Sequence, residues 1–336
     1  MTHAAQWWKT EEQGVRCLLC PHLCYLQANE TGICRTRQNS NNHLVTHAYN
    51  HVSALHIDPV EKKPLFHFLP GSQTLSIATN GCNLRCANCQ NAILSQFAPS
   101  GLKPEEAISP AQIIEMAKKN SCQSISYTYT EPTVYYEWML DIARLAKEAG
   151  LKNIMVSSGY INPQPLKELI PFLDAANIDL KSFDDDTYQN LSSARLHPVL
   201  KTLQLLLEAK VWLEITNLII PGWTDNMDIL KKMCVWLADN GFDNTPLHFS
   251  RFFPSHQLPG LPPTPVTVIE TAAEIAASHN MNYVYMGNLP INYPEITTCH
   301  HCHKTLITRM GNRLITCRLT TNICPECQQF VPGVFN

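Results

Sequence analysis

Short apolar runs alternate with amphipathic stretches along the middle of the chain, from about Gln73 to Asn288. Short apolar runs are typical of buried strands, and stretches with helical spacing are typical of the helices that cover them. The runs that predict strands are Thr74–Thr79, Ser124–Tyr129, Asn153–Ser157, Ala175–Leu180, Trp212–Ile219, Leu247–Phe252 and Tyr283–Met286.

The stretches between these runs carry the start and stop signals of helices. Ser109, Pro110 and Gln112 form the pattern of a capping box, with proline at the first helical position. Asp225 is placed to cap a helix over Met227–Asp239, which a glycine then ends. Two further helices are predicted over Val134–Glu148 and from Thr264 to about Ser278.

Strands that alternate with helices in this way predict βαβ units and a parallel sheet. Six or seven such units suggest a barrel of the TIM type, complete or partial, in which catalytic residues lie at the carboxyl ends of the strands. We therefore predict an α/β barrel over residues 71–290. A cysteine-rich extension over residues 1–70 precedes it, and a zinc-ribbon-like module over residues 291–336 follows it.

Polar residues gather at the predicted strand ends, although the strands themselves are mostly apolar. Because buried polar groups are costly without partners, this concentration predicts one shared polar cavity. Structural alternatives exist, such as a helix cap for Glu131 or an ion pair between Asp179 and Lys181. The residues concerned are Thr130 and Glu131 after the second strand, Ser157 and Ser158 after the third, Asp179 and Lys181 at the fourth, Asn217 in the fifth, and His248 and Arg251 in the sixth.

The composition narrows the possible classes of function. Of the 336 residues 16% are charged, and the formal net charge is −3, so there is no broad basic surface to neutralise nucleic-acid phosphates. No run approaches the roughly 20 apolar residues of a membrane span, and the first residues contain no signal-peptide core. We therefore expect a soluble, cytoplasmic protein with no membrane partner and no strong nucleic-acid signal.

The chain has 14 cysteines, which in a reducing cytosol indicate metal binding or catalysis rather than disulfides. Cys82, Cys86 and Cys89 follow the first barrel strand with the spacing C-x3-C-x2-C. Since a [4Fe–4S] cluster normally takes four cysteines, three thiolates leave one iron open for another ligand. The alternatives for this segment are a zinc knuckle and free thiols. The isolated Cys122 and Cys234 are predicted to be structural.

With this spacing after a first barrel strand, the sequence resembles the radical S-adenosylmethionine (radical SAM) superfamily. The resemblance implies that the open iron binds the amino and carboxylate groups of S-adenosylmethionine. It further implies that electron transfer yields a 5′-deoxyadenosyl radical, which abstracts hydrogen from a substrate. One position departs from the family pattern, because Asn88 stands where an aromatic residue commonly helps to position the adenine.

A narrower resemblance covers nearly the whole chain. The sequence is similar to the radical enzyme of the AmmeMemoRadiSam system, which is related to the activating enzymes of glycyl-radical enzymes such as pyruvate formate-lyase. The cysteine patterns at both ends contribute to this similarity. The other stretches that carry it are DPVEKKPLFHFLPGS (Asp58–Ser72), YTYTEPTVYYE (Tyr127–Glu137), NIDLKSF (Asn177–Phe183), LEITNLIIPG (Leu213–Gly222) and PLHFSRFFP (Pro246–Pro254).

The resemblance implies roles for the residues at the strand ends. Thr130 and Glu131 belong to the segment that holds the methionine amino group, with Glu131 as the acceptor. Ser157 and Ser158 are implied to contact the ribose or carboxylate region, and Asn217 the sulfonium ligand. The candidates for catalysis or substrate binding are Asp179, Lys181, His248 and Arg251. Asp179 is also a candidate for cofactor binding. The alternative for His248 is a core histidine whose hydrogen bonds are satisfied within the protein.

Two further cysteine groups flank the predicted barrel. Both have enough thiols for a tetrahedral zinc site or an auxiliary iron–sulfur cluster, since sulfur ligands suit both metals. Zinc is favoured at the C-terminus, where two C-x2-C pairs predict a zinc ribbon, and either metal fits the N-terminus. The groups are Cys17, Cys20, Cys24 and Cys34 at the N-terminus, and Cys299, Cys302, Cys324 and Cys327 at the C-terminus.

The sequence thus predicts a radical enzyme that cleaves S-adenosylmethionine reductively and abstracts hydrogen from a substrate that it does not identify. The related alternative is an activating enzyme for a glycyl-radical enzyme, which the extra cysteine groups and an acidic Glu214 disfavour. The alternative from another class is a zinc-binding interaction protein without catalysis. A radical enzyme implies a reductant protein such as flavodoxin or ferredoxin. The flanking groups suit a structural role, and they equally suit the docking of a protein substrate.

Overall fold

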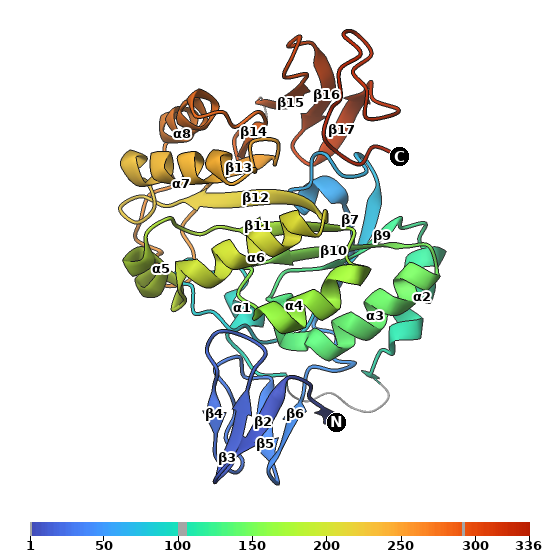
Figure 1. Ribbon diagram of the computed structural model, residues 1–336, viewed down its shortest axis with the longest axis vertical. Coiled ribbons are helices and arrows are strands. Elements are labelled where there is room, and N and C mark those ends of the chain that lie inside the picture. The colour runs from blue at the N-terminus through green and yellow to red at the C-terminus, as the bar shows by residue number, and fades with distance from the viewer. Residues whose placement is uncertain (1, 100–105, 291–292) are drawn as a thin grey trace.

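An eight-stranded sheet forms the centre of the computed structural model, which describes residues 2–99, 106–290 and 293–336 (Figure 1). The strands follow the order β14-β13-β12-β11-β10-β9-β8-β7. From β8 to β14 neighbouring strands run parallel, and β7 joins the edge antiparallel to β8. The strand bounds are β7 Ala54–Pro59, β8 Gln73–Ala78, β9 Ser124–Tyr127, β10 Lys152–Ser157, β11 Ala175–Asp179, β12 Trp212–Ile219, β13 Leu247–Arg251 and β14 Val284–Gly287.

Every strand predicted for the barrel is confirmed, with small differences at the ends. The largest difference is at β9, which ends at Tyr127 instead of Tyr129. Tyr129 has a backbone φ of 61°, and this left-handed conformation does not continue a strand. The chain therefore turns sharply at Tyr129, directly before the predicted site residues Thr130 and Glu131.

The sheet is open, because no ladder joins β14 to β7 among the described residues. The predicted α/β fold is therefore confirmed in its partial-barrel form. Figure 1 shows α3, α4 and α6 lying across one face of the sheet. Within the described ranges, no helix combines the length and the apolar character needed to cross a membrane. The helix bounds are α1 Ala92–Ser95, α2 Pro110–Lys119, α3 Tyr136–Glu148, α4 Pro163–Leu169, α5 Asp185–Ser192, α6 Leu196–Glu208, α7 Met227–Asp239 and α8 Val266–Ser278, with 3-10 turns over Val60–Lys62, Pro132–Tyr135 and Ile170–Phe172.

The cap of α7 differs from the prediction by one residue. Asn226, and not Asp225, caps the helix. The Oδ1 atom of Asn226 accepts hydrogen bonds from the backbone N–H groups of Asp228 at 3.0 Å and Ile229 at 3.3 Å. Asp225 instead accepts a hydrogen bond from the backbone N–H of Gly222 at 3.0 Å, which closes the preceding turn. The capping box predicted at the start of α2 is confirmed.

Replacing Asn226 with alanine should lower the free energy of unfolding by about 1 kcal/mol, the typical cost of losing an N-cap. Asp225→Ala is the matched control, and we expect it to cost less because the helix keeps its cap. Urea denaturation followed by circular dichroism measures both variants. A larger loss for Asp225→Ala than for Asn226→Ala would contradict the assigned cap.

Small three-stranded sheets lie at the two ends of the chain, and Figure 1 shows them on opposite sides of the barrel. The N-terminal region contains two such sheets, and residues before 71 also supply β7 to the central sheet. The domain boundaries themselves stay a prediction. The additional strands are β1 His3–Ala4, β2 Trp8–Glu11, β3 Gly14–Cys17, β4 Tyr25–Leu26, β5 Arg37–Ser40, β6 His43–Thr46, β15 Pro294–Thr298, β16 Thr305–Met310 and β17 Arg313–Cys317.

Candidate active site

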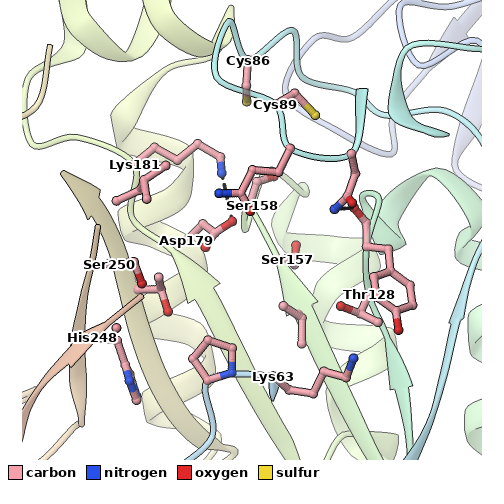
Figure 2. A pocket seen from close by; sticks show the side chains of 18 of the residues that line it. Lys63, Cys86, Cys89, Thr128, Ser157, Ser158, Asp179, Lys181, His248 and Ser250 are labelled. Atoms are coloured by element: carbon pink, nitrogen blue, oxygen red, sulfur yellow. Dashed lines mark hydrogen bonds and ion pairs between the residues drawn. The ribbon is translucent and has the colours of Figure 1, made fainter. Parts of the chain in front are cut away.

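A cavity of about 590 Å³ lies at the carboxyl ends of the parallel strands (Figure 2). Figure 2 shows Cys86 and Cys89 at one end of this cavity and Lys63 at the other. The strands β10 to β13 and the turn that follows β9 contribute polar side chains to its wall, which agrees with the expected place of chemistry in a barrel. These wall residues include Thr128, Thr130, Glu131, Ser157, Ser158, Asp179, Lys181, Thr216, His248 and Ser250.

The loop after β8 places the three motif cysteines on the cavity wall. The backbone N–H of Ala87 donates to the carbonyl of Leu191 at 2.8 Å, and this bond ties the loop to α5. The side chain of Asn91 donates to the carbonyl of Tyr129 at 2.7 Å, which ties the loop to the end of β9. Anchored on both sides, the loop presents three thiols to one space, as a cluster with three protein ligands requires.

The Glu131 carboxylate accepts five hydrogen bonds among the described residues, from Thr133, Ser157 and Ser158. Thr133 donates its backbone N–H at 3.2 Å and its hydroxyl at 2.8 Å, so the predicted helix cap is present. Ser157 donates its hydroxyl at 2.7 Å, and Ser158 donates its backbone N–H at 2.9 Å and its hydroxyl at 2.6 Å. A carboxylate has about four lone-pair sites, so Glu131 is fully engaged in joining the ends of β9 and β10. Its role as acceptor of the methionine amino group stays a prediction that needs one of these bonds to exchange.

Asp179 and Lys181 lie together on the cavity wall. The Nζ atom of Lys181 is 2.9 Å from Oδ2 of Asp179. Burial alone would lower the pKa of Lys181, but the neighbouring Asp179 carboxylate and Cys86 raise it well above its usual value. Figure 2 shows the pair on the side of the cavity where Cys86 lies. The pair therefore forms the ion pair that was the structural alternative, and it also faces the space beneath the cysteine loop.

His248 lines the cavity, but a buried carboxylate holds it in place. Its Nε2 is 2.7 Å from Oε2 of Glu214. Glu214 also accepts hydrogen bonds from the backbone N–H groups of Phe66 at 2.9 Å and His67 at 2.8 Å, and from the Trp212 ring at 3.1 Å. Burial would raise the pKa of Glu214, but the hydrogen bond from His248 lowers it below the usual value. His248 thus has the partner expected of a satisfied core histidine.

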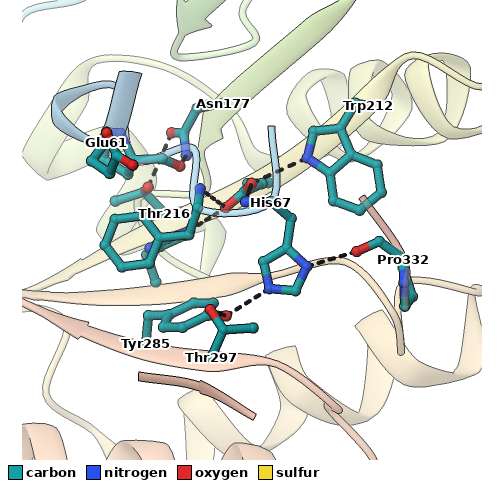
Figure 3. Close-up of polar contacts among 12 residues, drawn as sticks. Glu61, His67, Asn177, Trp212, Thr216, Tyr285, Thr297 and Pro332 are labelled. Atoms are coloured by element: carbon teal, nitrogen blue, oxygen red, sulfur yellow. Dashed lines mark hydrogen bonds and ion pairs between the residues drawn. The ribbon is translucent and has the colours of Figure 1, made fainter. Parts of the chain in front are cut away.

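His67 extends this network to the C-terminal part of the chain (Figure 3). Its Nδ1 is 2.7 Å from the carbonyl oxygen of Pro332, and its Nε2 is 2.6 Å from the hydroxyl of Tyr285. The Tyr285 hydroxyl lies 2.7 Å from Oγ1 of Thr297 in β15. Burial lowers the pKa of His67 to about 4, so the ring is neutral near pH 7. The network therefore fastens the C-terminal sheet to the floor of the cavity.

Asn217 and Arg251 lie outside the lining of the cavity. The Nδ2 of Asn217 donates to the carbonyl of Leu180 at 2.7 Å, and Nε of Arg251 donates to the carbonyl of Thr264. Side chains alternate between the two faces of a strand. Since Thr216 and Ser250 face the cavity, their neighbours Asn217 and Arg251 point to the opposite face.

Besides Lys181, the cavity wall carries two lysines that the sequence analysis did not identify. Lys62 and Lys63 line the cavity, and their Nζ atoms lie 2.8 Å and 2.7 Å from the two oxygens of Asp58. The Tyr129 hydroxyl donates to the same carboxylate, and its ring lies 4.6 Å from Nζ of Lys63. Burial lowers the pKa of Lys63 to about 8. The resemblance over Asp58–Ser72 was the available signal, but it assigned no role to these residues.

The C-terminal cysteines form a compact group of potential metal ligands. The sulfur atoms of Cys299, Cys302, Cys324 and Cys327 all lie within 4.8 Å of one another. The Sγ atoms of Cys299 and Cys327 are 3.6 Å apart, and those of Cys302 and Cys324 are 3.8 Å apart. Four thiolates on one tetrahedral ion with Zn–S bonds of about 2.3 Å lie about 3.8 Å apart. The donor set and its spacing therefore fit a single metal ion.

The N-terminal cysteines surround a second, smaller cavity. Cys17, Cys20, Cys24 and Cys34 all line it, although they come from different segments of the extension. Asn83, from the loop that carries the motif cysteines, also lines this cavity. The structure therefore brings together all four cysteines that the sequence grouped, and places them beside the candidate active site.

Comparison with known proteins agrees with this geometry. A family profile described as the radical SAM superfamily matches residues 76–233. An uncharacterised protein of Methanocaldococcus jannaschii is 43% identical over 97% of this chain and 98% of its own length. A pyruvate formate-lyase-activating enzyme of Clostridium pasteurianum is 26% identical over 49% of this chain and 68% of its own length.

A solved structure shows the same fold at low sequence identity. Streptococcus suis SuiB bound to S-adenosylmethionine matches with a TM-score of 0.52 and 15% identity, over 72% of this chain and 56% of that chain. The profile match begins within β8 and therefore includes the loop with Cys82, Cys86 and Cys89. The family profile, the similar sequences and the partial barrel agree, and the chain belongs to the radical SAM superfamily.

Proposed function

We propose that the protein cleaves S-adenosylmethionine reductively at a [4Fe–4S] cluster and uses the resulting radical to abstract hydrogen from a substrate held in the cavity. Membership of the radical SAM superfamily indicates an enzyme that carries out radical chemistry. The observation that carries the proposal is the position of Cys82, Cys86 and Cys89 on the wall of a 590 Å³ cavity. A pocket of several hundred Å³ is the usual size for a bound small molecule.

The residues of the chain supply binding and orientation. Cys82, Cys86 and Cys89 would hold the cluster, which when bound supplies the electron that cleaves the sulfonium to give a 5′-deoxyadenosyl radical. Asp179 and Lys181 offer opposite charges to the polar groups of a ligand in the cavity. Ser157 and Ser158 are held rigid by Glu131, which suits groups that must position a cofactor.

The superfamily and the named relatives indicate the general class of the partner and of the substrate. Radical SAM enzymes need a reductant, and we propose a carrier protein of the flavodoxin or ferredoxin type. The relatives named as pyruvate formate-lyase-activating enzymes favour a second candidate, activation of a glycyl-radical enzyme, in which the substrate is a protein. The narrower kinship with the AmmeMemoRadiSam system stays a prediction.

The test is an anaerobic assay of the reconstituted protein. With iron, sulfide, S-adenosylmethionine and dithionite, we expect 5′-deoxyadenosine to form, and we expect none when dithionite is omitted. The Cys122→Ala variant should form the nucleoside as wild type does, because Cys122 is a buried cysteine that does not line the cavity. A wild-type protein that carries a reducible four-iron cluster and still forms no nucleoside would contradict the proposal. A glycyl-radical signal in an added glycyl-radical enzyme would favour the second candidate.

We further propose that the C-terminal cysteines bind zinc, because their sulfurs have the spacing of a single tetrahedral ion. The variant Cys302→Ala should lose about one zinc per chain, since structural zinc sites need all four ligands. Cys317→Ala is the matched control, because Cys317 is exposed and lies outside the group. Elemental analysis of both purified variants measures the effect, and equal zinc content in the two would contradict the assignment.

A further inference from the structure

The four N-terminal cysteines converge on one point from three segments. Cys17 ends β3, Cys20 and Cys24 lie in the loop between β3 and β4, and Cys34 precedes β5. A Cβ atom added to Gly32 would lie 3.7 Å from the sulfurs of both Cys24 and Cys34, so these two sulfurs flank the same small region. All four residues line one cavity. The arrangement is therefore a four-thiol site, not a set of separate free cysteines.

The spacing of the sulfurs distinguishes this site from the C-terminal one. Within the described residues, the C-terminal cysteines are the group whose potential ligand atoms all lie within 4.8 Å of one another, and the N-terminal four do not form such a group. Sulfurs that share one zinc ion must be this close. In a cubane cluster each cysteine binds a different iron, so the sulfurs stand farther apart around a space that the cluster fills.

The same chain contains an internal standard for a cluster site. The cysteines of the radical SAM motif, Cys82, Cys86 and Cys89, also do not form a group within 4.8 Å, and they also line a cavity. The N-terminal site therefore resembles the motif cysteines and differs from the compact C-terminal group. It differs from the motif in having four thiols, which is the full set that a [4Fe–4S] cluster takes.

Hydrogen-bond donors around the N-terminal site favour the binding of an anionic group. The Arg37 side chain is buried, and its Nη1 lies 3.7 Å from the sulfur of Cys17, to which it donates. The Thr36 hydroxyl donates to the sulfur of Cys34 at 3.2 Å. Hydrogen bonds to thiolate sulfurs are a common means of tuning iron–sulfur clusters. Arg37 also forms a buried ion pair with Glu137, but its Nε is buried without a partner. Because Arg37 lines the cavity, an anionic cluster there would offer this Nε an acceptor.

We propose that Cys17, Cys20, Cys24 and Cys34 bind a second [4Fe–4S] cluster. With four protein ligands this cluster has no open iron, so it is not a second site for S-adenosylmethionine. The site lies next to the loop that carries Cys82, Cys86 and Cys89. Asn83 of this loop lines its cavity, and the ring Nε2 of His22 is 2.7 Å from the carbonyl oxygen of Asn83. This inference does not depend on the proposed reaction.

The decisive variant removes the motif cysteines and leaves the N-terminal ones. Cys82→Ala, Cys86→Ala and Cys89→Ala are combined in one chain, which is reconstituted anaerobically with iron and sulfide. We expect about four irons and about four sulfides per chain to remain, together with an electron paramagnetic resonance signal after reduction. Adding Cys20→Ala and Cys24→Ala should remove the iron, the sulfide and the signal. Adding Cys122→Ala, which replaces a buried cysteine outside both sites, should leave them.

A triple variant that is folded by circular dichroism but contains about two zinc ions and no iron would overturn the proposal. If the triple variant does not fold, the reciprocal chain with all four N-terminal cysteines replaced by alanine gives the answer. Its iron content should fall from about eight to about four per chain, and an unchanged iron content would overturn the proposal. Neither measurement involves cleavage of S-adenosylmethionine, so failure of this inference is distinguishable from failure of the proposed function.

Discussion

Replacing Cys86 with alanine is expected to reduce the formation of 5′-deoxyadenosine to the level of a protein-free control. The reason is the ligand count, because two remaining thiolates cannot hold a cluster that normally takes four ligands and here has three. The cavity and its wall should survive the substitution. The loop is anchored by backbone hydrogen bonds, from Arg85 to Ser192 at 3.0 Å and from Ala87 to Leu191 at 2.8 Å, which do not use the thiol.

The measurement is a time course of nucleoside formation by reconstituted wild type, Cys86→Ala and Cys234→Ala. Cys234 is a buried cysteine in the core of α7, far in sequence from every cysteine group, so Cys234→Ala controls for the general cost of losing a buried thiol. Iron analysis accompanies the assay and should show that Cys86→Ala loses about four irons relative to the control. Nucleoside formation by Cys86→Ala at the wild-type rate would show that these cysteines do not hold the reactive cluster.

Features encoded by neighbouring residues could be predicted from the sequence. The motif Cys82–Cys89 spans one loop, so its spacing alone brings the thiols together. The strand ends at Glu131, Ser157 and Asp179 meet because parallel strands align their carboxyl ends, which the alternation of strands and helices already implies. The C-terminal pairs Cys299/Cys302 and Cys324/Cys327 are two short knuckles, and the structure unites them in one compact group.

Two predicted site residues, Asn217 and Arg251, lie outside the cavity lining, and the reason can be read from the sequence. His248 and Arg251 are three positions apart in β13, so they lie on opposite faces of the strand and cannot both enter the cavity. The same alternation separates Asn217 from Thr216, whose side chain does line the cavity. Counting the strand positions from one confirmed cavity residue would have selected Thr216 and Ser250 instead of Asn217 and Arg251.

The remaining residues could not be placed because their partners are distant in sequence. Glu214 bonds to the backbone of Phe66 and His67, nearly 150 residues earlier in the chain. Lys63 enters the cavity from the segment before β8, which the sequence pattern assigned to the N-terminal extension. No periodicity predicts such long-range contacts, since they arise only when the whole sheet is assembled.

Replacing Glu214 with glutamine is expected to lower the free energy of unfolding by about 3 kcal/mol, because a buried ionised partner is removed from several donors. Glu214 is fully buried and accepts from His248, Trp212 and two backbone N–H groups. Glutamine has the same shape, but its amide offers one acceptor oxygen. Its NH2 group must then face a donor that the carboxylate had satisfied.

The control for this substitution is Glu208→Gln at the exposed end of α6, which should change stability by less than about 0.5 kcal/mol. Urea denaturation followed by tryptophan fluorescence gives both values, and Trp212, a partner of Glu214, reports directly on the site. The two outcomes separate the possible roles of this acid. A large loss of stability identifies Glu214 as the group that holds the cavity floor together. A stability equal to that of Glu208→Gln, combined with loss of 5′-deoxyadenosine formation, would instead place Glu214 in the catalytic machinery and overturn its structural assignment.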